Sequence, residues 1–230
     1  MHRRIFFFSL VFLLWSLPLF AGTIYGFVNL KGTPPPLKKI TVDKDGYCKK
    51  SKKERPSEAL LVSKNGKIKN VVLSLEGVKG SFPAPEDVVV IDQKECSYLP
   101  HITVIQAGTA VDVQSSDPVN HNVRSNPEEN EPVNYAMPEP MVIPLPDLLY
   151  SEAIRLTCDI HKWMSAYIVV TETPFFDLTD KTGSFEIKDV PEGTYTLRAW
   201  HEKLGVLTRE VVVPKAGKIE TDFIFSVQGK

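Results

Sequence analysis

Three side chains with soft or borderline donor atoms stand close together in the second half of the chain. Cys158, His161 and Met164 follow the spacing Cys-x2-His-x2-Met, which places a thiol, an imidazole and a thioether in one short segment. These donors favour copper over the harder divalent cations. We therefore interpret the segment as a copper-binding loop.

The loop lies between two hydrophobic stretches, residues 154–157 and 165–170, that have the composition of strands. A blue-copper centre needs two histidines and one cysteine in a plane, with a long and weak axial methionine, so the loop lacks one imidazole. His121 is the upstream histidine in a comparable setting. It follows the alternating strand 110–114 and the turn residues Ser-Ser-Asp-Pro.

The segment Asn120-His121-Asn122-Val, followed downstream by the Cys-x2-His-x2-Met loop, resembles the cupredoxin family of blue-copper proteins, which are Greek-key β-sandwiches. The short gap between the loop histidine and the methionine is similar to that of amicyanin. The resemblance covers roughly residues 22–171. It implies one type 1 copper ion, held in a plane by His121, Cys158 and His161 with Met164 as the axial ligand.

The same resemblance implies roles for the residues beside the ligands. The backbone N–H of Asn122 is expected to donate to the Cys158 sulfur, and Asn120 to pin the ligand loop. His161 is expected to present its ring edge to solvent as the electron port. Trp163 stands beside it and either belongs to an apolar docking patch or only packs within the loop.

The expected function of such a site is electron transfer, because a fixed trigonal cage lets copper change oxidation state with little change in geometry. We expect an electron carrier and not an enzyme. The neighbours of Cys158 are Thr157 and Asp159, whereas multicopper oxidases have histidines there that relay electrons to a second copper cluster. The sequence also contains no Cys-x-x-Cys-His haem motif and no Gly-rich phosphate loop. The expected partner is a redox protein, either a cytochrome or an oxidase or dehydrogenase, that docks transiently.

Two other functions stay open. The same residues could hold Cu(I) for delivery or storage without redox turnover. The four ligands could also be a buried cysteine, a core methionine and two incidental histidines. Alternatively, the chain is a non-redox binding module in which the C-terminal sandwich recognises a surface glycan or protein and the copper domain is vestigial. In that last case the function would survive Cys158→Ser.

The first 21 residues have the form of a secretory signal peptide. Arg3 and Arg4 precede an apolar run over residues 5–14, and small residues follow at Ala21-Gly22. The alternative is a membrane anchor, but the apolar run is shorter than the ~20 residues that a membrane span needs. We expect cleavage, no membrane attachment afterwards, and a periplasmic or secreted protein. The formal net charge of −1 argues against nucleic acid as a partner.

The cysteine count predicts a disulfide. Three cysteines are present, and if Cys158 binds metal then Cys48 and Cys96 are the natural pair in an oxidising compartment. Closing a loop of about 49 residues contributes roughly 4 kcal/mol in the chain-entropy model. The alternative is a second metal site that joins one of these cysteines to His101, but neither cysteine lies in a short Cys/His pair.

The remaining pattern predicts an all-β protein with two domains, residues 22–172 and 173–230. The second contains Thr-Gly-x-Phe-x-Ile-x-x-Val-Pro-x-Gly-x-Tyr-x-Leu at 182–197, which resembles the carboxypeptidase-regulatory-like, transthyretin-type β-sandwich. Because this segment is short for that fold, we expect it to pack on the copper domain and to share the strand near residues 24–30. His201 is expected to make a domain contact.

The connection over residues 124–149 is rich in proline and has little periodicity, which predicts a structureless cover. Met137 and Met141 lie in it and raise the alternative of a methionine site for acquiring copper. Two methionines are too few for that, so we expect them to pack against the sandwich.

Overall fold

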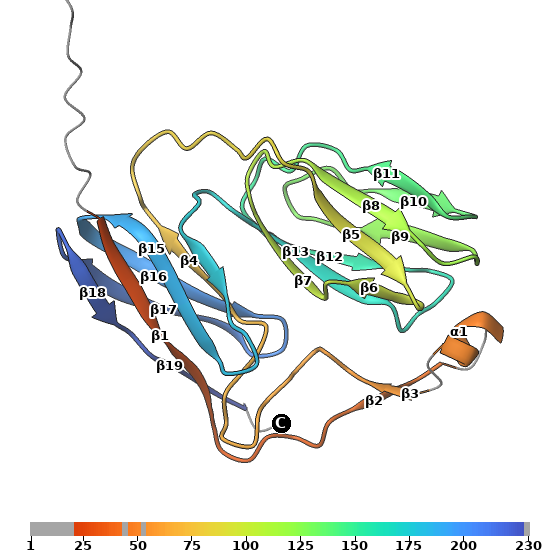
Figure 1. Ribbon diagram of the computed structural model, residues 1–230, viewed down its shortest axis with the longest axis horizontal. Helices are drawn as coiled ribbons and strands as arrows, with labels where there is room; N and C mark the ends of the chain where they lie inside the picture. The colour runs from red at the N-terminus through yellow and green to blue at the C-terminus, as the bar shows by residue number, and fades with distance from the viewer. Residues whose placement is uncertain (1–20, 43–45, 52–53, 228–230) are drawn as a thin grey trace, which may run out of the picture.

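The computed structural model describes residues 21–42, 46–51 and 54–227. Within these ranges the regular structure is β-strand apart from one helix of six residues, so the predicted all-β fold class is confirmed. The strands form two β-sandwiches that lie side by side (Figure 1). The predicted signal peptide lies outside the described residues except for Ala21. In the part of the chain that is described, no helix is long and apolar enough to cross a membrane.

The first sandwich, here called the C-terminal sandwich, packs two sheets face to face. In one sheet β1 lies between β15 on one side and β18 and β19 on the other, and the second sheet has the order β14-β4-β16-β17. The strands are β1 (Ala21–Lys31), β4 (Val72–Glu76), β14 (Phe176–Leu178), β15 (Ser184–Pro191), β16 (Gly193–His201), β17 (Gly205–Val213), β18 (Gly217–Glu220) and β19 (Phe223–Ser226).

Two strands of this sandwich come from the N-terminal third of the chain. β1 pairs with β15, β18 and β19, and β4 pairs with β14 and β16. The boundary expected between residues 172 and 173 therefore does not separate the two sandwiches, because residues 173–230 alone would leave the middle of both sheets open. The expectation that the strand near residues 24–30 is shared with this sandwich agrees with the observed pairing.

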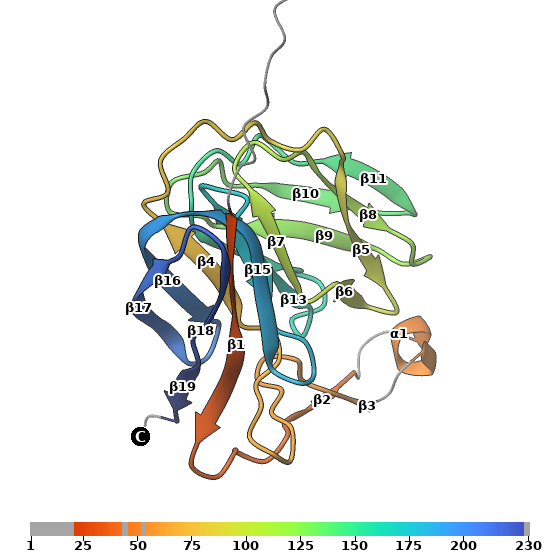
Figure 2. The same ribbon diagram turned by 60° about the vertical axis from the view of Figure 1, so that its left-hand side comes forward.

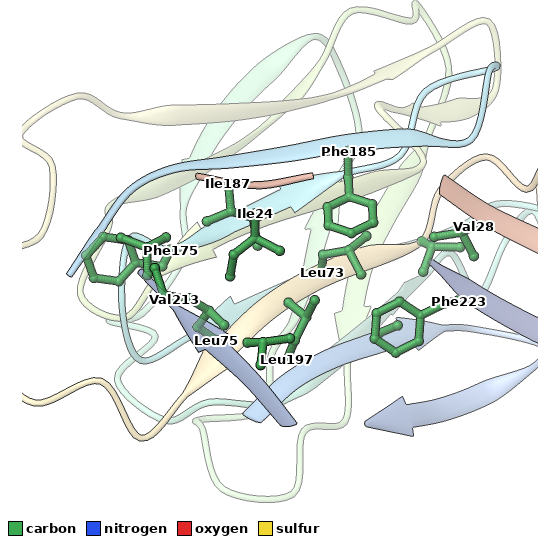
Figure 3. Packing of buried hydrophobic residues seen from close by; sticks show 14 of the residues in the cluster. Ile24, Val28, Leu73, Leu75, Phe175, Phe185, Ile187, Leu197, Val213 and Phe223 are labelled. Carbon is green, nitrogen blue, oxygen red and sulfur yellow. The ribbon is translucent and has the colours of Figure 1, made fainter. Parts of the chain in front are cut away.

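The core of the C-terminal sandwich is apolar (Figure 3). Ile24 and Val28 of β1 alternate with more exposed neighbours and lie among side chains of the opposite sheet, such as Leu197. This period of two residues is the pattern of a half-buried strand. Gly26 lets β1 run close to Thr221, whose carbonyl group would overlap a Cβ atom at this position.

The second sandwich, here called the central sandwich, contains β5 to β13. Its sheets have the orders β10-β9-β12-β13-β7 and β11-β8-β5-β6, with β13–β7 and β5–β8 parallel and the other pairs antiparallel. The strands are β5 (Val89–Lys94), β6 (Ser97–Leu99), β7 (Ile102–Gln106), β8 (Val111–Ser115), β9 (His121–Ser125), β10 (Asn134–Met137), β11 (Met141–Pro144), β12 (Ala153–Thr157) and β13 (Ser165–Thr171).

The connection over residues 124–149 is not structureless, so this expectation was wrong. It contributes β10 and β11, which are the outermost strands on one side of each sheet. A proline such as Pro144 is tolerated at a sheet edge, because no further strand needs its missing N–H. Met137 is fully buried in the core of the central sandwich and Met141 packs against that core, as expected.

The contacts between the two sandwiches include a small apolar cluster and a buried polar pair beside it. Trp200 of β16 packs edge to face on Tyr167 of β13, with ring centroids 5.3 Å apart. Beside them His101, in the turn before β7, bonds to Glu202, in the turn after β16. These contacts connect the loop end of the central sandwich to the C-terminal sandwich.

Between β1 and β4 the chain crosses from the C-terminal to the central sandwich (Figure 2). This excursion contains β2 (Lys39–Thr41), α1 (Gly46–Ser51) and β3 (Glu54–Pro56). Cys48 of α1 is bonded to Cys96 in the turn between β5 and β6, so the expected disulfide is present. A helix of six residues is marginal by itself, and the disulfide fixes this one against the end of the central sandwich.

Candidate metal centre

The predicted ligands come together at one end of the central sandwich. His121 is the first residue of β9, and Cys158 follows the last residue of β12, its neighbour in the sheet. The loop from β12 to β13 carries His161 and turns back through a hydrogen bond from the Met164 N–H to the His161 carbonyl, 2.8 Å long. The sheet pairing thus juxtaposes residues that are far apart in the sequence.

Three donor atoms converge in this place. The Sγ of Cys158 lies 4.0 Å from the Nδ1 of His121 and 4.0 Å from the Nδ1 of His161. The two Nδ1 atoms are 3.0 Å apart. The exposed fractions are 1 % for His121, 1 % for Cys158 and 2 % for His161. One thiol and two imidazoles therefore aim their donor atoms at a common, buried point.

The electrostatics of the cluster favour a thiolate beside an imidazolium in the metal-free protein. Burial opposes ionisation of Cys158, but hydrogen bonds from His121, His161 and the backbone N–H of Asn122 outweigh it and lower the pKa of the thiol to about 5. Burial also opposes charge on His121, yet its bond to Asp117 and the thiolate raise the pKa of the imidazole to about 9. The sulfur is therefore already deprotonated near neutral pH, which is the form that binds metal.

Asp117 is a functional residue that the sequence interpretation missed. Its Oδ2 lies 3.1 Å from the Nε2 of His121, which therefore carries a proton, and the Nδ1 of the same ring points at the cluster. Burial raises the pKa of this carboxyl group, but the bonds that it accepts from His121 and its other donors lower it overall. The available signal was its place four residues before His121, in a stretch interpreted only as a turn.

A strained hairpin holds Asp117 in place. The turn between β5 and β6 has positive φ at Glu95 and Cys96, 51° and 55°, which non-glycine residues adopt at a cost. This conformation directs both N–H groups at the Asp117 carboxylate, at 2.7 Å each. The hydroxyl of Tyr47 in α1 donates to it as well, at 3.1 Å.

A buried polar clamp from the opposite sheet fixes the backbone on either side of the ligands. The hydroxyl of Tyr98 in β6 lies 3.2 Å from the carbonyl of Asn122 and 3.0 Å from that of Thr157. Gln93 in β5 donates to the Tyr98 hydroxyl and to the Asn122 carbonyl. Asn122 follows His121 and Thr157 precedes Cys158, so the clamp holds β9 and β12 at a set separation. The sequence interpretation did not single out Tyr98 or Gln93.

The asparagine that pins the loop is Asn122 and not Asn120, which corrects the expectation. The Asn122 side chain accepts from the N–H of Asp159 at 2.6 Å and donates to the Asp159 and Asn134 side chains. Asn120 is exposed. Because Asp159 directly follows Cys158, the Asn122 side chain ties the ligand loop to β9, and its backbone N–H also contributes to lowering the pKa of the Cys158 thiol.

His161 does not present its ring edge to solvent, so the expected electron port is wrong for this residue. Its Nε2 lies 3.8 Å from the Sγ of Cys48, and its ring packs on Trp163 with centroids 4.9 Å apart. The expectation failed because α1, which is distant in sequence, is bonded over this end of the sandwich through Cys96. Trp163 is partly exposed and donates its Nε1–H to the Cys96 carbonyl at 3.2 Å.

The donor set fits copper. His121, Cys158 and His161 each offer one ligand atom, and these atoms all lie within 4.8 Å of one another. Two imidazoles with one thiolate are the in-plane set of a blue-copper centre. Cys96, Asp117 and His121 also lie close together, but the sulfur of Cys96 is engaged in the disulfide. Met164 is buried in the same core cluster as Cys158, and its role as an axial ligand stays a prediction.

Among the described residues, two further histidines, His101 and His201, lie outside this cluster. His101 bonds to the carbonyl of Ser165 at 3.1 Å and to Glu202, so it joins the two sandwiches as a hydrogen-bonded structural residue. His201 was expected at the domain contact. Its Nδ1 instead accepts the N–H groups of Lys203 and Leu204 in the turn after β16, and burial lowers the pKa of its ring to about 4.

Comparison with known proteins gives results for parts of the chain. The family described as "Polysaccharide lyase family 4, domain II" matches residues 170–221. No curated protein matches. The resemblance of the C-terminal residues to carboxypeptidase-regulatory-like domains stays a prediction.

The similar solved structures include cupredoxins. A novel purple cupredoxin from Nitrosopumilus maritimus is 18% identical with a TM-score of 0.32, over 36% of this chain and 99% of that one. Amicyanin from Paracoccus versutus is 19% identical with a TM-score of 0.34, over 43% and 97%. A copper-containing nitrite reductase from Thermus scotoductus is 20% identical with a TM-score of 0.35, over 42% of this chain. The match spans 24% of the reductase.

Proposed function

We propose that this protein is an exported, mononuclear type 1 copper protein that carries electrons in the periplasm and is not itself a catalyst. The observation that carries the proposal is the convergence of the Cys158 sulfur with the Nδ1 atoms of His121 and His161 at one buried point. The cupredoxin resemblance of the ligand motif supports it. The export step follows from the predicted signal peptide, and the partner from the predicted transient docking to a redox protein.

The ligand roles follow from the donor atoms. His121, Cys158 and His161 would hold the metal in the plane, and Met164 is proposed as the axial ligand. Bound there, copper would supply reversible one-electron chemistry. Asp117 sets the tautomer of His121, and the N–H groups of Asn122 and His161 stabilise the charge on the Cys158 sulfur.

The surroundings suit electron transfer because they hold the ligands still. Tyr98 and Gln93 clamp the backbone at both strand ends, and Asn122 ties the loop to β9. A side chain that is locked by packing and hydrogen bonds moves little when the charge of the site changes. A low reorganisation cost is what a fast carrier needs.

The alternative function, Cu(I) storage or delivery, calls for ligands that a receiving protein can reach. Here each of the three donors is at most 2 % exposed, and the helix with its disulfide covers the His161 edge. This burial favours electron transfer over exchange of the metal. The third possibility, a non-redox binding module, requires that function is kept when Cys158 is replaced.

Voltammetry of the copper-loaded mature chain, with and without a competing Cu(I) chelator, tests the proposal. We expect a reversible one-electron couple that persists over repeated cycles with the chelator present, and no couple in Cys158→Ser. Loss of copper to the chelator on each reduction would assign the site to copper handling. Absence of any couple in a protein that binds copper would reject the carrier function.

A further inference from the structure

A groove of about 540 Å³ opens beside the buried ligand cluster, between the central and the C-terminal sandwich. Trp163 and the segment around Pro35 and Pro36 contribute to its lining. The charged residues that line it are five cations and one acid, namely Lys38, Lys39, Arg155, Lys162, Lys203 and Glu202. The chain as a whole has 27 basic and 28 acidic residues, so this local excess of positive charge is not a consequence of composition.

The single carboxylate in the groove is buried and already partnered. The side chain of Glu202 is 5 % exposed, bonds to His101 and lies 3.8 Å from the Nζ of Lys203. The cations reach solvent: the side chains of Lys162 and Lys203 are 72 % and 56 % exposed, with Lys162 3.5 Å from Asp159 and Lys203 3.8 Å from Glu202. Long-range attraction from the groove therefore acts on negative charge.

Trp163 connects the groove to the ligand cluster. Its indole lines the groove and packs on the ring of His161, with centroids 4.9 Å apart. The Nε2 of His161 faces the Cys48 sulfur under α1, so a partner does not reach that atom directly. From the groove, a partner can contact Trp163, a side chain that touches the ligand His161.

We propose that this basic groove is the docking surface for a redox protein with an acidic face, and that Trp163 is the contact next to the ligand His161. The inference rests on the proposed carrier function. One electron would pass between the partner and the copper ion that His121, Cys158 and His161 would hold, and no atom or proton is transferred. Attraction between unlike charges raises the rate of encounter and makes it sensitive to salt.

The test compares the unaltered mature protein with two double variants of equal charge. Lys38→Glu with Lys203→Glu reverses charge in the groove. Lys79→Glu with Lys188→Glu is the control, in the β4–β5 connection and in β15, and neither residue lines the groove. Replacing Lys188 leaves its partner Glu186 paired with Lys218, at 2.9 Å. The midpoint potential of each variant is measured first, so that driving force is known.

Stopped-flow rates are then measured with hexacyanoferrate as the anionic probe and hexaammineruthenium as the cationic probe. We expect the groove variant to react about tenfold more slowly with hexacyanoferrate, with weaker salt dependence, and faster with hexaammineruthenium. The control variant should change much less. Equal changes in both variants would overturn the proposal, because they would reflect net charge alone.

A second readout does not depend on electron transfer. Binding of an oligo-aspartate peptide to the mature chain, with and without copper, is mapped by nuclear magnetic resonance. The expected shifts concentrate at Lys38, Arg155, Trp163 and Lys203 and disappear in the groove variant. Shifts spread over the surface, or none, would overturn the docking surface. If the copper-loaded protein has no redox couple but the peptide still binds in the groove, the carrier function is rejected. The groove then remains a binding surface for acidic ligands.

Discussion

The core of the C-terminal sandwich and the loop end of the central sandwich bury different kinds of side chain. The core of the C-terminal sandwich is formed by aliphatic and phenylalanine side chains (Figure 3), and its buried histidine, His201, is held neutral. The loop end of the central sandwich instead buries His121, Cys158, His161 and Asp117 within a few ångströms of one another. Buried polar groups cost free energy unless they are hydrogen-bonded, and here they bond to each other.

The difference indicates that the C-terminal sandwich mainly supports the fold, whereas the loop end of the central sandwich carries the candidate metal site. The C-terminal sandwich also has non-glycine residues with positive φ, Asn70 and Asp189, at 65° and 56°. Through Glu202 and His101 it bonds to the carbonyl of Ser165, which ends the ligand loop. The central sandwich accepts a hairpin with positive φ at Glu95 and Cys96 because that hairpin holds Asp117. Local strain of this kind persists where a site needs it.

Truncating the apolar core should affect stability and leave the metal site unchanged. Leu197→Ala removes a fully buried side chain from the C-terminal sandwich, so we expect a loss of about 2–5 kcal/mol in the free energy of unfolding. The visible spectrum of the copper-loaded protein should not change. Urea denaturation checks the first point, with Val212→Ala, on the exposed face of β17, as the control. A changed spectrum would mean that the two regions are not independent.

Removing the disulfide should lower the free energy of unfolding and also expose the metal site. Cys48→Ala with Cys96→Ala opens a cross-link between residues 48 positions apart, and the chain-entropy model gives a loss of about 4 kcal/mol. It also releases α1 from the His161 edge, so a chelator should remove copper faster than from the unaltered protein. Unchanged removal rates would show that α1 does not protect the site.

Acid should destabilise the C-terminal sandwich through His201. Burial lowers the pKa of this ring from 6.5 to about 4. The unfolded chain therefore takes up a proton at a higher pH than the folded chain. The stability that the neutral ring provides is complete above pH 6.5 and is lost progressively down to pH 4, by on the order of 3 kcal/mol.

The measurement is the free energy of unfolding against pH for the unaltered protein and for His201→Asn, which keeps an acceptor for the Lys203 and Leu204 N–H groups. We expect the variant to lose less stability between pH 6.5 and 4. Parallel curves for the two proteins would contradict the assignment to His201.

Replacing Asp117 should weaken the metal site by a smaller amount. Asp117→Asn keeps the shape of the side chain but removes the charge that orients His121. Loss of such a partner commonly costs 10- to 100-fold in metal affinity, so we expect about this range. Competition with a chelator measures it, and Asp112→Asn, on β8 away from the ligands, is the control. Equal metal affinities for the two variants would show that Asp117 does not contribute to metal binding.

Much of the fold and the ligand set could be predicted because the signals are local. Strand alternation indicated an all-β chain, and Cys158 with His161 were recognisable from their spacing in one loop. The pairing of Cys48 with Cys96 followed from the number of cysteines. These inferences use residue type, the number of cysteines with Cys158 assigned to the metal, and short-range spacing.

The features that were missed depend on contacts between distant segments. The cover over His161 comes from Cys48, 113 residues away, and the N–H groups that hold Asp117 come from a hairpin 21 and 22 residues upstream. The membership of β4 in the C-terminal sandwich is likewise decided by pairing with β14 and β16. Short-range patterns do not encode which distant strand fills a sheet.

The most direct test of the central claim is the visible and electron paramagnetic resonance spectrum of the mature protein loaded with Cu(II), beside the Cys158→Ser variant. A thiolate bound to copper in a trigonal site predicts an intense charge-transfer band and narrow copper hyperfine splitting, both lost in the variant. A loaded protein that is colourless under oxidising conditions, or a spectrum that survives Cys158→Ser, would contradict the type 1 site.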